Sequence, residues 1–211
     1  MIYIAGDSHV FSYQHYEKWR VEWIGAALAY LIDTYLPPTL VMMERYRDAI
    51  KHDDFVAMMV GEIDCRWSIP KHADERQESD EENINRCVER FVTANDALAK
   101  GYPVVVFGVH PSTTHQHNIT ESGRSTYPYS KDHVGMVWST PERRNAITRA
   151  WNDHLSEWCR RRDVPFLSIY DYLVGADGTT DMSYYLDYCH LNGDMVVPFW
   201  EQEMKRLGIE I

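Results

Sequence analysis

The chain has 211 residues, of which 45% are hydrophobic, 25% charged and 13% aromatic, as in an ordinary globular protein. Its 32 acidic and 21 basic residues give a net charge of -11, so its long-range field repels nucleic-acid backbones and anionic membrane surfaces. The basic run from Arg160 to Arg162 is too short to offset that field. We therefore expect neither nucleic acid nor membrane as a partner. The length predicts a single domain over residues 1–211.

The sequence also indicates where in the cell the protein is located. No stretch reaches the ~20 apolar residues of a membrane span, and residues 1–10 lack the basic start and apolar run of a secretory leader. The four cysteines are widely spaced and form no Cys-x-x-Cys pair, which favours reduced thiols over a disulfide framework. We therefore predict a cytoplasmic location.

Short apolar runs predict buried strands at 2–5, 21–24, 55–60, 104–109 and 166–169. Helical patterns lie between them at 26–34, 40–51, 79–101, from Thr140-Pro141 onward, and at 193–207. Ser79 with Glu82 three residues later is typical of a capping box. The acidic, polar segment 74–83 is interpreted as a solvated loop that leads into this helix.

Strands that alternate with helices predict an α/β fold with a mostly parallel sheet covered on both faces. In such sheets, ligands bind beyond the carboxyl ends of the strands. Polar residues follow four of the predicted strands, at 6–9, 25, 61–66 and 110–114. We expect the functional chemistry there.

Ser8 follows the first strand in Gly6-Asp7-Ser8-His9, where a turn can present its hydroxyl at the sheet edge. Such a serine is either a helix cap or a nucleophile. Near the other end of the chain, Asp187 stands three residues before His190, a spacing that lets a carboxylate orient an imidazole that acts as general base. The alternative for His190 is a surface residue at the start of a helix.

Three segments, Gly6-Asp7-Ser8, Gly61-Glu62-Ile63-Asp64 and Asp187-x-x-His190, resemble blocks one, three and five of the GDSL/SGNH hydrolases, in family order. The resemblance implies a flavodoxin-like three-layer α/β/α fold and ester hydrolysis through an acyl-enzyme, without a cofactor. It makes Ser8 the nucleophile, His190 the general base and Asp187 the orienting acid. Gly25 looks like the block-two glycine whose amide points at the oxyanion, or it is a plain turn residue.

Block three departs from the family pattern, because Ile63 occupies the position of an asparagine that donates to the oxyanion. Loss of one such donor costs about 10² to 10³ in turnover, so we expect a slow, inactive or compensated site. Arg66 could compensate as a nearby cation, or could pair with Glu62 or Asp64 as structure. The Gly-Glu-Ile-Asp-Cys-Arg segment looks like that of sugar-related members, which implies an O-acetyl-glycan substrate.

Other residues beside these segments are candidates for lining the site: His9, Asp64, Trp67 and His110. Cys65 and Cys189 also neighbour it, which makes a thiol nucleophile an alternative. His115 and His117 could bind a metal from a turn, but no carboxylate or thiolate completes the set, so we predict no metal site.

Residues 111–138 lack periodicity and contain aromatic side chains, namely Tyr127, Tyr129 and Trp138, together with His133. We predict that they form one wall of the site; the alternative is aromatic packing.

The sequence therefore predicts a serine esterase that hydrolyses a small acyl ester, most simply acetyl on a neutral carbohydrate. The alternatives are an inactive glycan-binding module of the same fold and a sugar O-acyltransferase. The partner is a small-molecule or glycan ester, and the oligomeric state is not indicated.

Overall fold

The computed structural model describes residues 1–114, 137–187 and 189–210. Five strands within these ranges run parallel: β1 Ile2–Gly6, β2 Trp19–Trp23, β3 Phe55–Met59, β4 Val106–Phe107 and β5 Phe166–Leu167. β1 lies between β2 and β3, and a parallel bridge from Val56 to Val104 joins β3 to the pair of β4 and β5. The sheet order is thus β2-β1-β3-β4-β5, as in flavodoxin-like folds.

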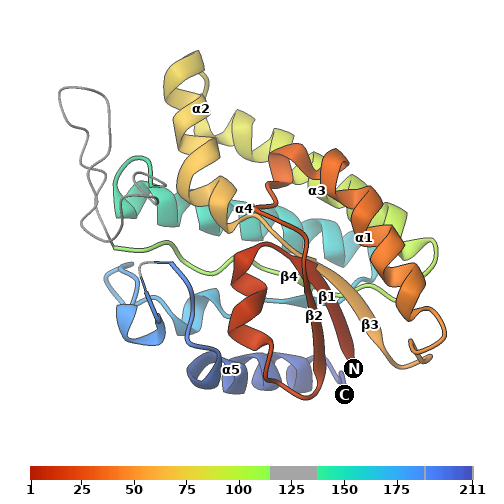
Figure 1. Ribbon diagram of the computed structural model, residues 1–211. Coiled ribbons are helices and arrows are strands. Elements are labelled where there is room, and N and C mark those ends of the chain that lie inside the picture. Colours follow the sequence, from red (N-terminus) through yellow and green to blue (C-terminus); the bar gives the residue numbers. More distant parts are fainter. Residues whose placement is uncertain (115–136, 188, 211) are drawn as a thin grey trace.

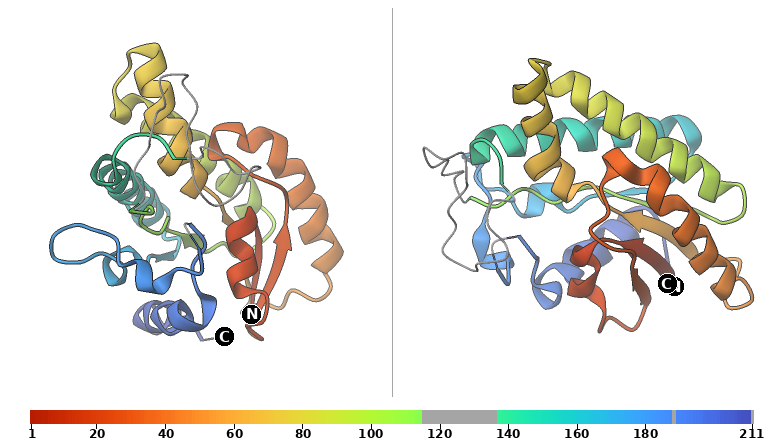
Figure 2. Two further views of the ribbon diagram at one scale, coloured as in Figure 1. Left: turned by 60° about the vertical axis from the view of Figure 1, so that its left-hand side comes forward. Right: turned by 45° about the horizontal axis from the view of Figure 1, so that its top comes forward.

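Helices cover both faces of this sheet (Figure 1). The helices α1 Ile32–Tyr46, α3 Asp80–Ala99 and α4 Pro141–Arg162 lie on one face, and α5 Gly193–Arg206 lies on the other (Figure 2). Along β1, Tyr3 and Ala5 pack on the first face, whereas Ile2 and Ile4 pack on the face of α5, and all four are at most 4% exposed. The predicted three-layer α/β/α fold with a mostly parallel sheet is confirmed.

The helix between β2 and β3 differs from the prediction. The sequence predicted two helices, at 26–34 and 40–51, but a single helix α1 runs through Pro37 and Pro38 and ends at Tyr46. The two amide donors that the prolines lack would have met the carbonyls of Asp33 and Thr34. Because both residues are exposed, water can replace those donors. Residues 26–31 instead form a loop and the short turn η2, Ala29–Leu31.

The acidic segment 74–83 is only partly a loop. The π-helix η3, Asp64–Ser68, continues into α2, Ile69–Arg76, so residues 74–76 are helical. This helix has eight residues and a proline in its first turn, which is too short to show a clear period. The predicted capping box then opens α3: the amide of Glu82 donates to Ser79 Oγ (3.2 Å), and the amide of Ser79 donates to Glu82 Oε2 (2.8 Å).

Two further observations bear on the sequence predictions. Within the described ranges, no helix combines the length and apolar character needed to cross a membrane. The four cysteines are all buried and carry free thiols. The single domain over 1–211 and the cytoplasmic location stay predictions.

Candidate active site

Three side chains from opposite ends of the chain form a continuous hydrogen-bonded series. Ser8 opens the 3₁₀ helix η1, Ser8–Tyr13, directly after β1, and its Oγ lies 2.9 Å from Nε2 of His190. On the other side of the imidazole, Nδ1 lies 2.7 Å from Oδ2 of Asp187. With the proton on Nδ1 directed at this carboxylate, Nε2 is left to accept the hydroxyl proton of Ser8.

The loop before α5 holds Asp187 in place. The backbone amides of Cys189 (2.8 Å) and His190 (2.7 Å) both donate to its Oδ1, which leaves Oδ2 for the imidazole. Burial raises the pKa of Asp187, but these amides and the imidazole outweigh it and lower that pKa. The carboxylate is therefore ionised at neutral pH, as a group that orients a histidine must be.

A glycine lets the segments that carry Ser8 and His190 approach each other. A Cβ atom at Gly193, the first residue of α5, would lie 1.7 Å from the carbonyl oxygen of Ser12 in η1. No side chain fits in that space, so glycine allows the segment after His190 to pack against the segment after Ser8. The close approach of these two backbones positions the base beside the hydroxyl.

The surroundings of His190 make it a stronger base. The largest influence on its pKa is the contact with Cys189, whose Sγ is 3.6 Å from Nδ1 and which raises the pKa. Burial and the charge of His9 lower the pKa of His190, whereas the hydrogen bond to Asp187 raises it. The net effect is a raised pKa. Cys189 is 2% exposed and contacts the nitrogen turned away from Ser8, so its thiol does not take the position of the nucleophile. Cys65 is buried in the core at 1% exposure.

Two backbone amides are available beside Ser8. Gly25 follows β2 with φ +105°, a conformation that favours glycine. Among the described residues, neither the amide of Gly25 nor that of Ser8 has a hydrogen-bond acceptor. Unpaired amides at the carboxyl ends of neighbouring strands are suited to an oxyanion.

Asp64 lies behind this segment rather than at its surface. Its side chain is fully buried, and its two oxygens accept the amides of Ala29 (2.7 Å) and Tyr30 (3.2 Å). Burial raises the pKa of Asp64 to about 7, against the lowering effect of the two amides. The sequence grouped Asp64 with substrate-binding residues, but its contacts anchor the loop that carries Gly25.

The comparisons with known proteins bear on this geometry. No family model matches the sequence, and no curated protein matches it. Solved structures do match: a GDSL-like lipase from Bacteroides thetaiotaomicron has a TM-score of 0.53 at 13% identity, over 98% of this chain and 87% of its own. A member of the lipolytic G-D-S-L family from Veillonella parvula has a TM-score of 0.51 at 12% identity, over 100% and 98%. The chain has the GDSL/SGNH hydrolase fold. At these identities the likeness establishes the fold alone.

The block-three segment departs from the SGNH pattern in the structure as well. Ile63 is 5% exposed, and its side chain has no donor to offer. Arg66 is 2% exposed and forms a two-point pair with Glu62, with Nε 2.6 Å from Oε1 and a terminal nitrogen 3.0 Å from Oε2. Of the two roles the sequence allowed for Arg66, the geometry favours the structural pairing with Glu62.

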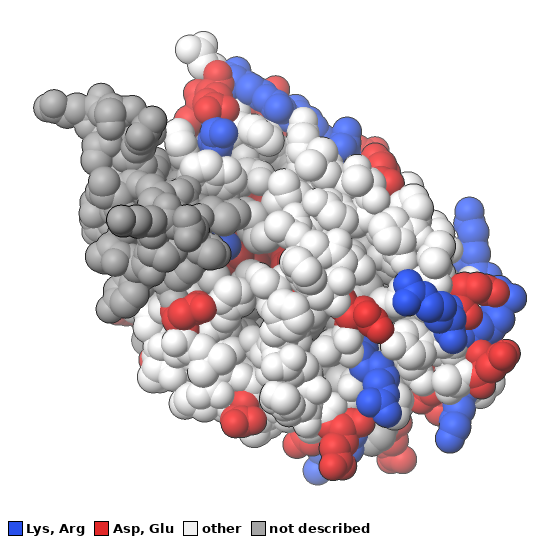
Figure 3. Space-filling model, in the orientation of Figure 1, with Lys and Arg blue, Asp and Glu red and all other residues white. Residues whose placement is uncertain are grey.

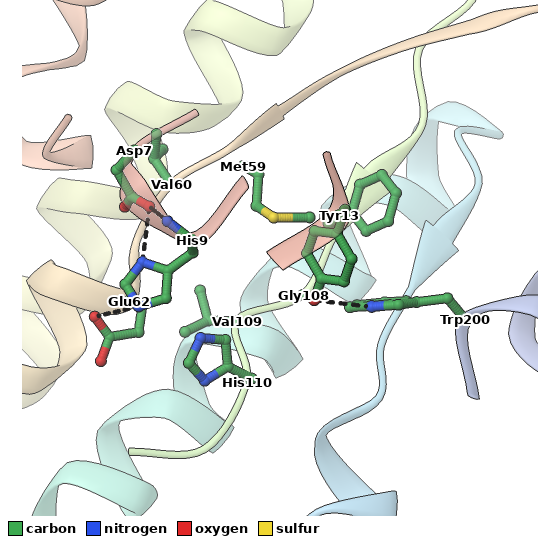
Figure 4. Close-up of a pocket in the computed structure, with 11 residues that line it drawn as sticks. Asp7, His9, Tyr13, Met59, Val60, Glu62, Gly108, Val109, His110 and Trp200 are labelled. Atoms are coloured by element: carbon green, nitrogen blue, oxygen red, sulfur yellow. Dashed lines mark hydrogen bonds and ion pairs between the residues drawn. The ribbon is translucent and has the colours of Figure 1, made fainter. Parts of the chain in front are cut away.

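In this SGNH fold, His9 and His110 line a small pocket (Figure 4), and the ring of His9 packs against that of His190 with centroids 4.9 Å apart. His9 is 4% exposed and contacts Asp7 and Glu62. His110 contacts the carbonyl of Pro111 through Nδ1 (3.1 Å), and burial together with the charge of His9 lowers its pKa to about 4. Both residues support the site from inside, and neither is positioned at its surface. Together with Cys189, His9 and His190 also bring three possible metal-ligand atoms within 4.8 Å of one another.

Sequence reasoning did not single out Tyr185, which contacts His110 (3.2 Å) and donates to the carbonyl of Pro111 (2.5 Å). No local pattern could have shown it, because 75 positions separate Tyr185 from His110. Asp7 was also passed over. Asp7 stands two residues before His9, and at this spacing its carboxylate can accept the backbone amide of His9, as it does in the structure. This spacing could have indicated Asp7 from the sequence.

Trp67, which the sequence named as a candidate for lining the site, packs against two other side chains. It is partly buried, makes an edge contact with Trp138 at 5.5 Å between ring centroids, and lies beneath the ammonium group of Lys71. Trp138 in turn donates to Asp74 (2.6 Å). The other residues predicted for an aromatic wall or a histidine pair lie outside the described residues: His115, His117, Tyr127, Tyr129 and His133.

Proposed function

We propose that this protein is a serine esterase that hydrolyses a small acyl ester through an acyl-enzyme on Ser8. The observation that carries the proposal is the continuous series from Ser8 through His190 to Asp187, with contacts of 2.9 and 2.7 Å. It lies at the carboxyl ends of parallel strands, where an α/β sheet binds its ligands. A GDSL-like lipase and a member of the lipolytic G-D-S-L family among proteins of this fold support the same reaction class.

The reaction follows from these contacts. Oγ of Ser8 attacks the ester carbonyl carbon while Nε2 of His190 takes its proton, and Asp187 compensates the charge of the imidazolium. His190 then gives the proton to the leaving alcohol oxygen as the carbon-oxygen bond breaks, which leaves an acyl-serine. A water molecule, deprotonated by the same nitrogen, then attacks the acyl carbon. As the bond from this carbon to Oγ breaks, His190 returns the proton to Oγ, which releases the acid and regenerates Ser8.

The developing oxyanion needs donors. The amides of Ser8 and Gly25 supply two in this proposal. A third donor, which the family takes from asparagine, is missing at Ile63, and the buried Arg66 is engaged with Glu62. We therefore expect slow turnover, lower by about 10² to 10³ than with a complete set of donors.

For the substrate, we propose acetyl on a neutral carbohydrate. Two exposed aromatic rings flank the triad segments: Phe11 is 46% exposed, Trp23 is 57% exposed, and their centroids are 5.9 Å apart. Aromatic faces of this kind pack against the apolar face of a sugar ring. On the described part of the face in Figure 3, both signs of charge are scattered and no continuous basic patch is visible. With a net charge of -11, this disfavours polyanionic glycans.

The decisive experiment is covalent labelling with a fluorophosphonate probe. We expect the probe to modify Ser8 in the folded protein, as located by peptide mass spectrometry. Labelling should be lost in Ser8→Ala and kept in Ser12→Ala, a serine in the same short helix. Absence of labelling in folded wild-type protein would contradict the acyl-enzyme.

The substrate class is tested separately. Trp23→Ala should raise the KM for an acetylated oligosaccharide by about fivefold to tenfold and leave kcat/KM for p-nitrophenyl acetate nearly unchanged. Equal effects on both substrates would count against sugar binding at Trp23.

A second candidate is a glycan-binding module without turnover, which the missing donor at Ile63 favours. Saccharide binding that survives Ser8→Ala, with no hydrolysis of any acetyl ester, would support it.

A third outcome is acyl transfer to a sugar hydroxyl, which the same triad allows if water is excluded. Analysis of products from an acetylated donor and a sugar acceptor separates transfer from hydrolysis.

A further inference from the structure

His9, the residue next to the proposed nucleophile, is buried between two carboxylates. Its Nδ1 lies 2.8 Å from Oδ1 of Asp7, and its Nε2 lies 3.3 Å from Oε2 of Glu62. Figure 4 shows the imidazole between these two side chains. All three residues are at most 5% exposed, so water does not screen their charges.

The charges in contact favour a protonated His9. Glu62 is already paired with the guanidinium of Arg66, at 2.6 and 3.0 Å. With His9 neutral, Glu62 would still face Arg66, but the buried carboxylate of Asp7 would face an uncharged ring. Such a charge is costly in the interior, whereas a protonated His9 balances two anions with two cations.

The ring of His9 also packs against His190. Their centroids are 4.9 Å apart and their planes are inclined by 37°. Titratable groups face His9 from every neighbouring element. Asp7 belongs to its own segment, and Glu62 comes from the segment after β3, with Arg66 and Asp64 behind it. His110 follows β4, and Cys189 and His190 precede α5.

We propose that His9 is a positioning residue, a fixed buried cation that packs against His190 and favours the uncharged form of this imidazole, which is the form that accepts the proton of Ser8. A positive charge 4.9 Å from a second imidazole opposes its protonation. In the resting protein, His190 then stays a base at lower pH than it would beside a neutral ring. The proposal rests on the esterase function for its catalytic meaning, but the charge of His9 can be measured without turnover.

The electrostatics of the cluster agree with this geometry. Burial lowers the pKa of His9, but Asp7 and Glu62 outweigh it and raise that pKa well above its usual range. His110, whose ring centroid is 5.0 Å from that of His9, is kept neutral, because burial and the charge of His9 lower its pKa to about 4. Of the two imidazoles that pack against His9, that of His110 is therefore uncharged at neutral pH.

The first measurement uses the folded wild-type protein with ¹⁵N-labelled histidine. We expect both ring nitrogens of His9 to stay protonated from about pH 5 to well above pH 7, while His190 titrates. Signals are assigned by their loss in His9→Asn and in His190→Asn. A His9 that titrates near 6.5, or is neutral at pH 7, would overturn the proposal.

The second measurement follows the influence of His9 on His190. His9→Asn keeps a donor toward Asp7 but removes the charge, and His9→Gln does the same toward Glu62. In both variants the titration of His190, and the acidic limb of kcat/KM for p-nitrophenyl acetate, should move to higher pH. A unit charge at 4.9 Å shifts a pKa by about half a unit even in bulk water, so a shift of at least that size is expected.

The control is His52→Asn, because His52 is fully exposed and should leave both curves unchanged. A purely structural role for His9 would lower the melting temperature without moving the titration of His190, and that result would refute the proposal. If no ester is turned over and Ser8 is not labelled, the esterase function fails, but the titrations still decide the role of His9.

Discussion

Nε2 of His190 lies 2.9 Å from Oγ of Ser8, although 182 positions separate the two residues in the chain. The contact joins the segment after β1 to the segment before α5. It places a base at hydrogen-bond distance from a hydroxyl at the edge of a parallel sheet, which is the geometry that acyl transfer requires.

Replacing this hydroxyl should abolish turnover. Ser8→Ala is expected to lower kcat/KM for p-nitrophenyl acetate by at least about 10³-fold, because the variant lacks the hydroxyl that takes the acyl group in the proposed reaction. Ser12→Ala, in the same η1, should retain full activity and serves as the control. If the two variants hydrolyse the ester equally fast, Ser8 is not the nucleophile.

Asp187→Asn should impair catalysis without loosening the loop. Its amide oxygen can still accept the amides of Cys189 and His190, but its NH₂ group faces Nδ1 and favours the tautomer with the proton on Nε2. We expect kcat to fall by about 10² to 10⁴ with little change in melting temperature. The matched control is Asp181→Asn, because Asp181 accepts the amide of Ser183 (2.9 Å) and should tolerate the change. A loss below tenfold for Asp187→Asn would show that the carboxylate does not orient the base.

The buried pair of Glu62 and Arg66 should contribute strongly to stability. Glu62→Gln leaves a buried guanidinium without its counter-charge, and we expect the free energy of unfolding in urea to fall by about 3 kcal/mol. Glu44→Gln removes a comparable contact to Arg47 (2.9 Å) at the surface and should cost at most about 1 kcal/mol. Similar losses in both variants would contradict a special role for the buried pair.

Glu62 should also steepen the acid dependence of stability. Burial raises its pKa, but Arg66 and His9 outweigh it and lower that pKa from 4.5 to about 2. A carboxylate with a lowered pKa in the folded state stabilises the protein above 4.5, and this contribution is lost as the pH falls toward 2. Urea unfolding across this window should therefore show a steeper decline for wild type than for Glu62→Gln. Parallel curves would mean that Glu62 titrates normally.

Gly25→Ala should affect both folding and turnover. The residue has φ +105°, and an added Cβ would meet only the ring of Tyr35 at 3.7 Å, so backbone strain of about 1 to 2 kcal/mol dominates the cost. A shifted amide should lower kcat by about tenfold or more. Gly178→Ala, at φ +79° with open space around it, should show similar strain with normal kcat. Normal turnover in Gly25→Ala would remove its amide from the oxyanion site.

Local sequence patterns predicted much of the architecture. Apolar runs marked the five strands because buried parallel strands need such runs, and the capping box at Ser79 marked the start of α3 because both partners lie within one turn. The same reasoning failed at Pro37 and Pro38, where exposed carbonyls let a helix continue through two prolines. It also missed α2, whose eight residues are too few to show a period.

The sequence by itself determined the layered α/β fold and the candidates Ser8, Asp187 and His190. The alternation of strands with helices along the chain and the short motifs both depend on residues that are neighbours in the sequence. Only the tertiary structure decided which distant groups meet. It brought His190 to Ser8, directed Arg66 to Glu62, and enclosed His9 between Asp7 and Glu62. Burial then determined the charges, because a side chain removed from water takes the protonation state that its few remaining neighbours can compensate.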